Sequence, residues 1–213
     1  WIAGAVAAAS GAAPLVEFDG DDAIVRLIMT SGTTGSAKAA AYSLAAMRYR
    51  IAEGHLHWTD GRPELTLIGL STTGGFHAAL GSLALGVPYL AIDRIDAESL
   101  AFAARHGIEV LCGSPTQVAH ALGVLNDSGL SLPSLGEVRL AGAGPSPALL
   151  RHITDTLGVP VVGVYGSTEG GGVSMLTLRV DGDRFDVGHP LPDVELEIID
   201  PDAGSHRPLS VDD

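Results

Sequence analysis

Nine residues that follow one apolar segment combine the groups that bind phosphate. The apolar segment IVRLIM, residues 24–29, leads directly into TSGTTGSAK, Thr30–Lys38. Its glycines allow successive backbone N–H groups to point into one concavity, and the hydroxyls of Ser31, Thr33 and Thr34 add donors. With the final lysine as a cation, this loop suits a triphosphate or a pyrophosphate. It is not a Walker A loop, because glycine and lysine are not adjacent, and a purely structural glycine-rich loop is the alternative.

A second polar turn follows another apolar segment. The sequence YGSTE, Tyr165–Glu169, ends the run that begins at Val159, and glycines follow it. A carboxylate held at a strand end beside a phosphate loop suits Mg²⁺, which takes one or two protein carboxylates and completes its shell with phosphates and water. We therefore expect Glu169 to be a magnesium ligand. The alternative is an acidic side chain that is simply solvated.

The elements that must position these turns alternate between strand and helix. Predicted strands cover residues 24–29, 65–70, 87–92, 108–112, 138–141 and 159–165. Helical spacing links Val118, Ala121 and Leu125, recurs between residues 149 and 157, and follows Ser43, a residue type that caps helices. Several strands are continuously apolar, as buried parallel strands are. The pattern predicts an α/β fold: a parallel sheet flanked by helices, with functional loops at the carboxyl ends of its strands.

The pattern changes after residue 172. Segments 173–180, 184–187 and 194–200 alternate in polarity, and Asp181, Gly182 and Asp183 form a turn between the first two. We expect residues 1–172 to form the α/β part and residues 173–213 to begin a β-rich antiparallel subdomain.

The composition narrows the classes of partner. Twelve Lys and Arg stand against 25 Asp and Glu, which gives a net charge of −13 and an electrostatic field that repels nucleic acid. The longest apolar stretch, residues 74–92, is interrupted by glycines, His77 and Pro88, so we expect no membrane insertion. One cysteine, Cys112, cannot form an internal disulfide, and we expect it to be a buried hydrophobe in a cytoplasmic protein.

Four segments together resemble a known family. They are TSGTTGSAK at 30–38, RLAGAGPSPALL at 139–150, YGSTE at 165–169 and VGHPLPDVELEIIDPD at 187–202. Their order and approximate spacing are similar to those of the acyl-adenylate-forming superfamily of AMP-dependent synthetases and ligases, which includes acyl-CoA synthetases. The resemblance extends from about residue 22 to residue 202 and implies the central part of the family's large N-terminal domain.

The resemblance implies a role for each matching residue. The loop would wrap the β and γ phosphates of ATP with Thr30, Ser31, Gly32, Thr33, Thr34, Gly35 and Lys38. Gly142, Ala143 and Gly144 would line the adenine, with the ring of Tyr165 on its other face and Gly166 in the same nucleotide-binding set. Thr168 would contact the α phosphate and Glu169 would hold Mg²⁺. Lys38, Thr168 and Glu169 are the catalytic candidates on this basis.

Some positions depart from the family pattern. Ala37 and Ala39 flank Lys38 where the family usually has Pro and Gly, so the loop is less rigid at its exit. Leu44 stands where the family has a His at the start of the next helix. His77 lies near the predicted acyl pocket and could contact the substrate, and a histidine on an ordinary helix face is the alternative.

The resemblance implies an acid–thiol ligase. A carboxylate would attack the α phosphorus of Mg·ATP, pyrophosphate would leave, and the acyl-AMP would pass to a thiol, with CoA the expected acceptor and a carrier-protein thiol the alternative. The family's ribose-binding Asp, its hinge and its C-terminal lid domain would lie beyond residue 213, so we expect a fragment of the enzyme. A noncatalytic nucleotide-binding or interaction module of the same fold remains the alternative, the carboxylic acid is unidentified, and a homodimer is left open.

Overall fold

A computed structural model describes residues 19–30, 38–52, 60–179, 188–192, 194–197 and 199. Its strands are β1 (Ile24–Thr30), β2 (Lys38–Ser43), β3 (Glu64–Thr66), β4 (Tyr89–Ala91), β5 (Val110–Gly113), β6 (Glu137–Ala141), β7 (Val161–Ser167) and β8 (Gly171–Thr177). Its helices are α2 (Leu44–Ala52), α4 (Thr73–Leu85), α5 (Ala97–Arg105), α6 (Pro115–Ser128) and α7 (Pro147–Leu157). No helix among these residues is long and apolar enough to cross a membrane.

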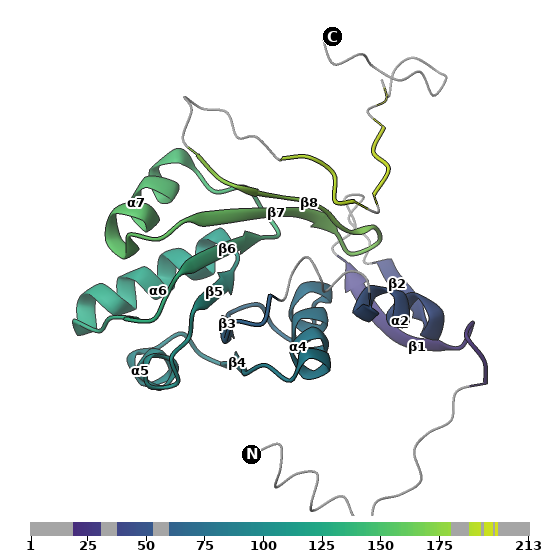
Figure 1. Cartoon of the computed structure of the whole chain (residues 1–213), viewed down its shortest axis with the longest axis horizontal. Coiled ribbons are helices and arrows are strands. Elements are labelled where there is room, and N and C mark those ends of the chain that lie inside the picture. Colours follow the sequence, from purple (N-terminus) through teal and green to yellow (C-terminus); the bar gives the residue numbers. More distant parts are fainter. Residues whose placement is uncertain are drawn as a thin grey trace, which may run out of the picture.

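A six-stranded sheet forms the centre of the described structure. Its order is β4-β3-β5-β6-β7-β8, and every neighbouring pair is parallel except β7 and β8. Helices α5, α6 and α7 lie along one face of this sheet, whereas α4 lies on the opposite face (Figure 1). The predicted α/β fold with a parallel, helix-flanked sheet is confirmed.

The main core lies between the sheet and α5, α6 and α7. Its most buried members include Leu111 and Val138 from the strands and Leu100, Leu122 and Ile153 from the helices. The residues that show helical spacing in the sequence supply α6 and α7 with their buried faces. Burial of aliphatic side chains is the main favourable contribution to the free energy of folding, and close packing leaves buried groups little room to move. This layer therefore holds the strands of the sheet in place.

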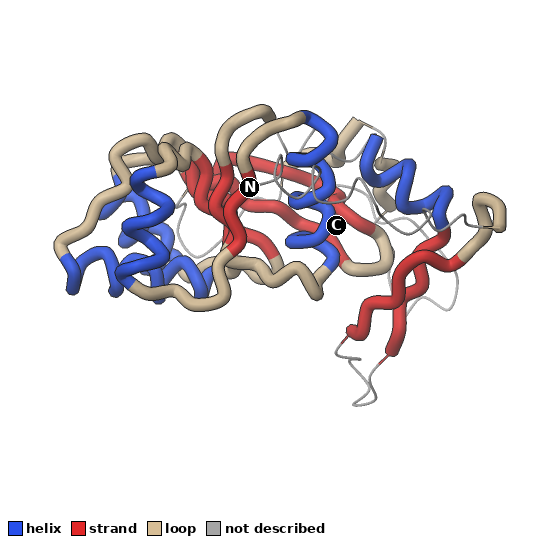
Figure 2. The backbone as a smooth tube through the Cα atoms, turned by 90° about the horizontal axis from the view of Figure 1, so that it is seen from below, coloured by secondary structure: helices blue, strands red, loops and turns tan. Residues whose placement is uncertain are grey.

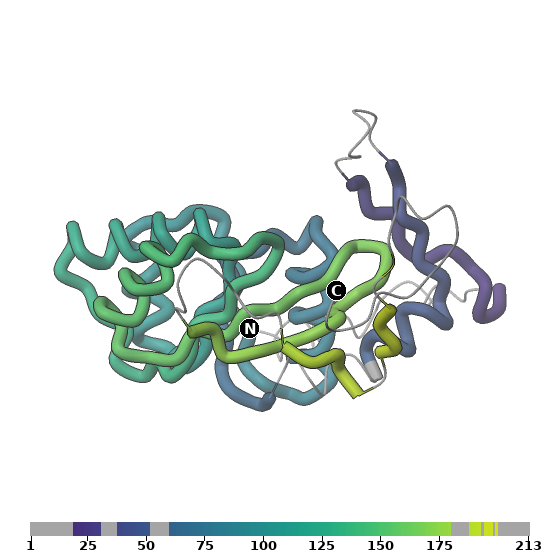
Figure 3. The backbone as a smooth tube through the Cα atoms, turned by 90° about the horizontal axis from the view of Figure 1, so that it is seen from above, coloured from purple at the N-terminus to yellow at the C-terminus, as the bar shows by residue number. Residues whose placement is uncertain are grey.

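One predicted strand lies outside the parallel sheet. Residues 24–29 do form most of β1, but β1 pairs antiparallel with β2 in a separate two-stranded sheet. The prediction of a buried strand is therefore wrong, since Leu27 and Met29 are each 66% exposed. Only the other face of the hairpin packs inward, through Ile28 and Tyr42. Figures 2 and 3 show this hairpin projecting from the body of the molecule.

Other elements differ from their predicted bounds. The predicted strand 65–70 is limited to β3, because the residues from Leu67 onward turn away to reach α4. Helices α4 and α5 were not predicted, and Thr72 and Asp96 cap them. The antiparallel direction predicted for residues 173–180 is confirmed for β8, which joins the six-stranded sheet. The division at residue 172 stays a prediction.

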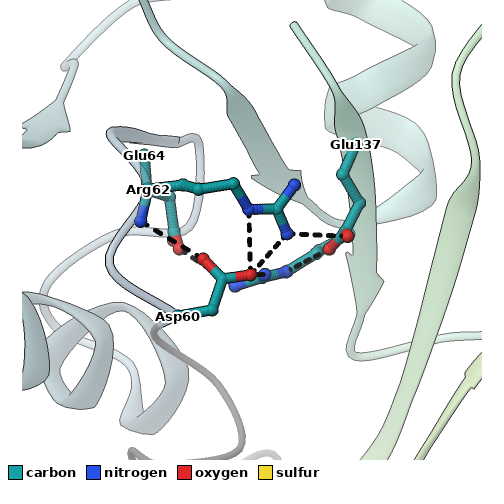
Figure 4. A network of polar contacts seen from close by, with 5 residues as sticks. Asp60, Arg62, Glu64 and Glu137 are labelled. Carbon is teal, nitrogen blue, oxygen red and sulfur yellow. Dashed lines mark hydrogen bonds and ion pairs between the residues drawn. The ribbon is translucent and has the colours of Figure 1, made fainter.

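Five charged side chains meet at the amino ends of β3 and β6 (Figure 4). Arg139 is almost fully buried, and its guanidinium donates to Asp60 at 2.7 Å and to Glu137 at 2.5 Å. Arg62 donates to Glu137 at 2.8 Å and also bonds Asp60. Glu64 Oε2 lies 3.6 Å from Arg139 Nη1. The other oxygen of this carboxyl, Oε1, is buried without a hydrogen-bond partner among the described residues. This charged cluster ties the loop before β3 to β6 at the centre of the sheet.

The pKa values of two carboxyls in this cluster, Glu64 and Asp60, are shifted in opposite directions. Burial raises the pKa of Glu64 to about 7, against the opposing charge of Arg139. Burial also disfavours the charged form of Asp60, but hydrogen bonds from Arg62 and the charge of Arg139 outweigh it and lower its pKa to about 2. The cluster holds three carboxyls and two guanidinium groups, so its net charge is zero when Glu64 carries a proton.

We expect Glu64→Gln to remove a loss of stability between about pH 4.5 and about pH 7. A carboxyl whose pKa is raised in the folded state binds a proton that the unfolded chain has released, so stability falls as pH rises from about 4.5 to about 7. The wild type should lose on the order of 2 kcal/mol over this range, measured by urea denaturation, and the variant should not. Exposed Glu98→Gln is the control. Parallel pH profiles for wild type and Glu64→Gln would contradict the assignment.

Candidate functional site

A cavity of about 810 Å³ opens at the carboxyl edge of the parallel strands. Residues that directly follow β3, β5, β6 and β7 line it, together with the start of α4; they include Ile68, Gly69, Ser114, Gly142, Thr168, Thr73 and His77. This is the edge at which the sequence predicts functional loops. No Asp or Glu side chain lines the cavity among the described residues.

Two helices begin at this cavity. The hydroxyl of Thr72 accepts from the backbone N–H of Gly75 at the start of α4, and the hydroxyl of Ser114 accepts from that of Gln117 at the start of α6. The Gln117 side chain closes a capping box and also donates to the carbonyl of Leu67 at 2.6 Å. These caps fix where each helix starts, and the positive ends of both helix dipoles face the cavity.

A smaller cleft of about 230 Å³ adjoins the cavity. It is lined by the residues expected at adenine, Gly142, Ala143, Gly144 and Tyr165, and by Gly166 of the same nucleotide-binding set. Gly142, Val164 and Gly166 line both hollows, so the two lie side by side at these residues. The structure thus brings together the predicted adenine-binding residues from the loops after β6 and β7. It also places them beside Thr168.

The turn after β7 carries the predicted α-phosphate and metal ligands. Thr168 lines the cavity, and the side chain of Glu169 is exposed. The backbone carbonyl of Thr168 accepts a hydrogen bond from the hydroxyl of Tyr42, and that of Glu169 accepts one from Arg50 Nη2 at 2.8 Å. Both contacts use main-chain oxygens, so they leave the Thr168 hydroxyl and the Glu169 carboxylate available to a ligand.

Tyr42 is the centre of a small second core. It is buried beside Ile28 and Met47, its ring meets that of His77 edge to face at 6.0 Å between centroids, and the Arg50 guanidinium lies 4.6 Å from its ring centroid. His77, predicted near the acyl pocket, lines the cavity from α4. These contacts join β2 and α2 to α4.

Arg26 ties β1 to the loop that precedes α4. Its guanidinium donates to the carbonyl of Leu70 at 2.7 Å and lies 3.5 Å from the centroid of the Phe76 ring. Desolvation lowers the pKa of this guanidinium from its ordinary value, and the charge of Tyr42 opposes the shift. The hairpin is thereby attached to the cavity wall as well as to the turn after β7.

The predicted phosphate loop is only partly within the described residues. Ser31, Gly32, Thr33, Thr34 and Gly35 lie outside them. Thr30 and Lys38 face each other as the last pair of the hairpin, and the Thr30 hydroxyl lies 3.4 Å from the Lys38 carbonyl oxygen. Residues 31–37 therefore connect two antiparallel strands, not a parallel strand to a helix. Cys112 is buried as expected, and desolvation raises the pKa of its thiol.

Sequence reasoning missed Tyr42 and Arg50. Each acts on a residue more than a hundred positions away, with separations of 126 and 119 residues along the chain. No local motif marks such contacts. A signal did exist for Ser114, since Ser114, Pro115 and Gln117 match the order of a capping box with proline in the first turn.

We expect Gly166→Ala to destabilise the fold by about 1–3 kcal/mol. A Cβ at this position would collide with the backbone carbonyl of Gly171 on β8, where no flexible side chain can move aside. Gly144→Ala is the matched control, because its Cβ meets nothing within 4 Å. Urea denaturation should show a lower midpoint for Gly166→Ala only. Equal midpoints for the two variants would refute the close approach of β7 and β8.

Comparisons with known proteins agree with this architecture. The family described as AMP-binding enzyme matches residues 4–211. A 4-chlorobenzoate–CoA ligase from an Arthrobacter species is 28% identical over 146 residues, which cover 66% of this chain, and the chain spans only 28% of that ligase's length.

Two solved structures share the fold. The amide bond synthetase McbA from Marinactinospora thermotolerans superposes with a TM-score of 0.72 at 26% identity and covers 92% of this chain and 40% of its own. O-succinylbenzoate CoA synthetase from Bacillus subtilis, in complex with ATP and magnesium ion, superposes with a TM-score of 0.71 at 21% identity. The match covers 93% of this chain and 42% of that synthetase. Because the family model matches nearly all of this chain, the chain belongs to the AMP-binding enzyme family.

Proposed function

We propose that the protein activates a carboxylic acid with Mg·ATP to an acyl-AMP and transfers the acyl group to a thiol, with CoA as the acceptor. The observation that carries this proposal is the pair of adjoining hollows that share Gly142 and Gly166 in their walls, with Thr168 in the larger one. A nucleotide in the smaller cleft and an acid in the larger cavity would therefore lie next to each other at these residues. Relatives named as CoA ligases support the same reaction.

The nucleotide would lie along the loops after β6 and β7. Gly142, Ala143 and Gly144 expose backbone without side chains that would fill the cleft, and Tyr165 is 55% exposed, so its ring is available for stacking. From there the phosphates would extend toward Thr168 and the hairpin that holds Lys38. Adenylation needs alignment and charge neutralisation more than covalent catalysis, which suits hydroxyls, amides and one lysine.

The described residues fit a phosphate-bound magnesium ion. Glu169 offers an exposed carboxylate at the turn, and among the described residues no group of three or more His, Cys, Asp and Glu side chains is arranged to hold a metal ion by itself. Mg²⁺ commonly takes one protein carboxylate and fills its remaining positions with phosphate oxygens and water, which matches this arrangement. When bound, the ion neutralises charge on the phosphates. Glu169 would hold it, and Thr168 would donate to the α phosphate.

The acid would occupy the larger cavity. An interior without carboxylates among its described lining residues, together with two helix N-termini, avoids repelling an anionic substrate. The reacting carboxylate would lie near Gly166, which lines both hollows, and near Thr168 in the larger cavity. The rest of the acid would extend toward Thr73 and His77 at the start of α4. We place residues 1–172 as the nucleotide- and acyl-binding part of a cytoplasmic ligase.

We expect Glu169→Gln to slow adenylation at least tenfold at limiting Mg²⁺, because a neutral amide offers the ion no charge. The measurement is acid-dependent ATP–pyrophosphate exchange by the full-length protein. Excess Mg²⁺ should restore part of the rate. Asp127→Asn, an exposed carboxylate on α6, is the control and should exchange at the wild-type rate. An unchanged rate for Glu169→Gln at limiting Mg²⁺ would remove Glu169 as the ligand.

We expect Lys38→Met to raise the KM for Mg·ATP about tenfold while the KM for the acid stays unchanged, because its ammonium would contact only the phosphates. Lys38 is the only lysine among the 213 residues, so no neighbouring lysine of this chain can substitute for it. Arg151→Met, an exposed cation on α7, is the control. A rise in both KM values would show that Lys38 does not act on the nucleotide alone.

A further inference from the structure

The turn that carries Thr168 and Glu169 is held from outside its own sheet. Tyr42 from β2 donates to the carbonyl of Thr168, and Arg50 from α2 donates to the carbonyl of Glu169 at 2.8 Å. The Arg50 guanidinium also packs against Gly171: a Cβ atom added at this glycine would lie 3.4 Å from Cζ and from Nη1 of Arg50. Consecutive carbonyls are thus fixed by two side chains that also contact each other.

Tyr42 and Arg50 belong to the same unit as the ends of the phosphate loop. Thr30 and Lys38 end the β1–β2 hairpin, and α2 follows β2 without a break. The turn, in contrast, belongs to the six-stranded sheet. The hairpin projects from that sheet (Figures 2 and 3), and among its contacts with the rest of the molecule those of Tyr42 and Arg50 reach the turn itself.

The turn needs such support because of its composition. Gly170, Gly171 and Gly172 follow Glu169, and Gly171 has a φ of +82°. Glycines leave the backbone many conformations, so an exposed carboxylate next to them has no fixed position of its own. Within the turn, Gly170 N–H donates to the Ser167 hydroxyl at 2.9 Å, which leaves the carbonyls of Thr168 and Glu169 to be fixed by Tyr42 and Arg50.

We propose that Tyr42 and Arg50 are positioning residues, which set the Thr168 hydroxyl and the Glu169 carboxylate relative to the hairpin that ends at Thr30 and Lys38. The functional part of this inference rests on the proposed adenylation. The Arg50 guanidinium and the Tyr42 hydroxyl both donate to main-chain oxygens. The side chains of Thr168 and Glu169 therefore remain available to bind the ligand. Arg50 has a further consequence: its positive charge stands beside the turn without an ion pair to Glu169 among the described contacts, which leaves that carboxylate free for a metal ion.

The first test measures the position of the turn without any activity. Amide hydrogen exchange at residues 170–172 should be about tenfold faster in Arg50→Gln and in Tyr42→Phe than in the wild type, because each variant loses one fixed carbonyl. Arg48→Gln and Tyr49→Phe are matched controls on α2, since Arg48 pairs with Asp21 at the surface and Tyr49 is 56% exposed. Thermal denaturation must show that all variants are folded. Equal exchange at residues 170–172 in wild type and both test variants would overturn the proposal.

The second test uses ATP–pyrophosphate exchange by the full-length protein. Arg50→Gln should need about tenfold more Mg²⁺ for half-maximal exchange, with the KM for the acid unchanged, and Arg50→Lys should recover part of the loss. A raised KM for the acid with a normal Mg²⁺ requirement would instead make Arg50 a substrate-binding residue and overturn the proposal. If the wild type shows no exchange with any acid, the proposed function fails, and the hydrogen-exchange result still decides whether the two residues position the turn.

Discussion

The common direction of β3, β5, β6 and β7 is the constraint on which the site depends. Because these strands are parallel, the segments that leave their carboxyl ends emerge at one edge of the sheet, although they are far apart in the sequence. Both hollows lie at that edge. The layer of α5, α6 and α7 behind the sheet fixes the strand ends from which these polar turns start.

The hairpin unit adds what a parallel sheet alone does not supply. Its cations, Arg26 and Arg50, bind carbonyl oxygens of the sheet's own loops, and its buried Tyr42 packs against α4. Under the proposed function, a phosphate loop on an antiparallel hairpin has no helix N-terminus directly behind it, so charge on the loop itself would matter more. Lys38 would supply that charge at the first residue of β2.

Short sequence patterns predicted the helices whose buried faces and caps are formed by residues close together in the chain. The spacing from Val118 to Leu125 predicted α6, and Ser43 was correctly expected to cap α2, where its hydroxyl accepts from Ala46. The pairing of IVRLIM could not be predicted in this way, because an apolar run does not reveal whether one face of the strand or both will be covered. The charged cluster was missed for a similar reason. Arg139 meets a carboxylate 79 positions away, and a buried ion pair leaves no periodic signal.

The charged cluster and the cavity lie at opposite ends of the strands. Glu64 and Glu137 begin β3 and β6, whereas the cavity is lined by residues that follow those same strands. Substitutions of cavity side chains therefore do not touch the charged network, although a close backbone approach such as that of Gly166 still limits what the lining can accept. Under the proposed function, side chains that contact the acid could change without removing the ion pairs that secure the centre of the sheet. The separation of structural charge from substrate contact would then favour diversification of the substrate range.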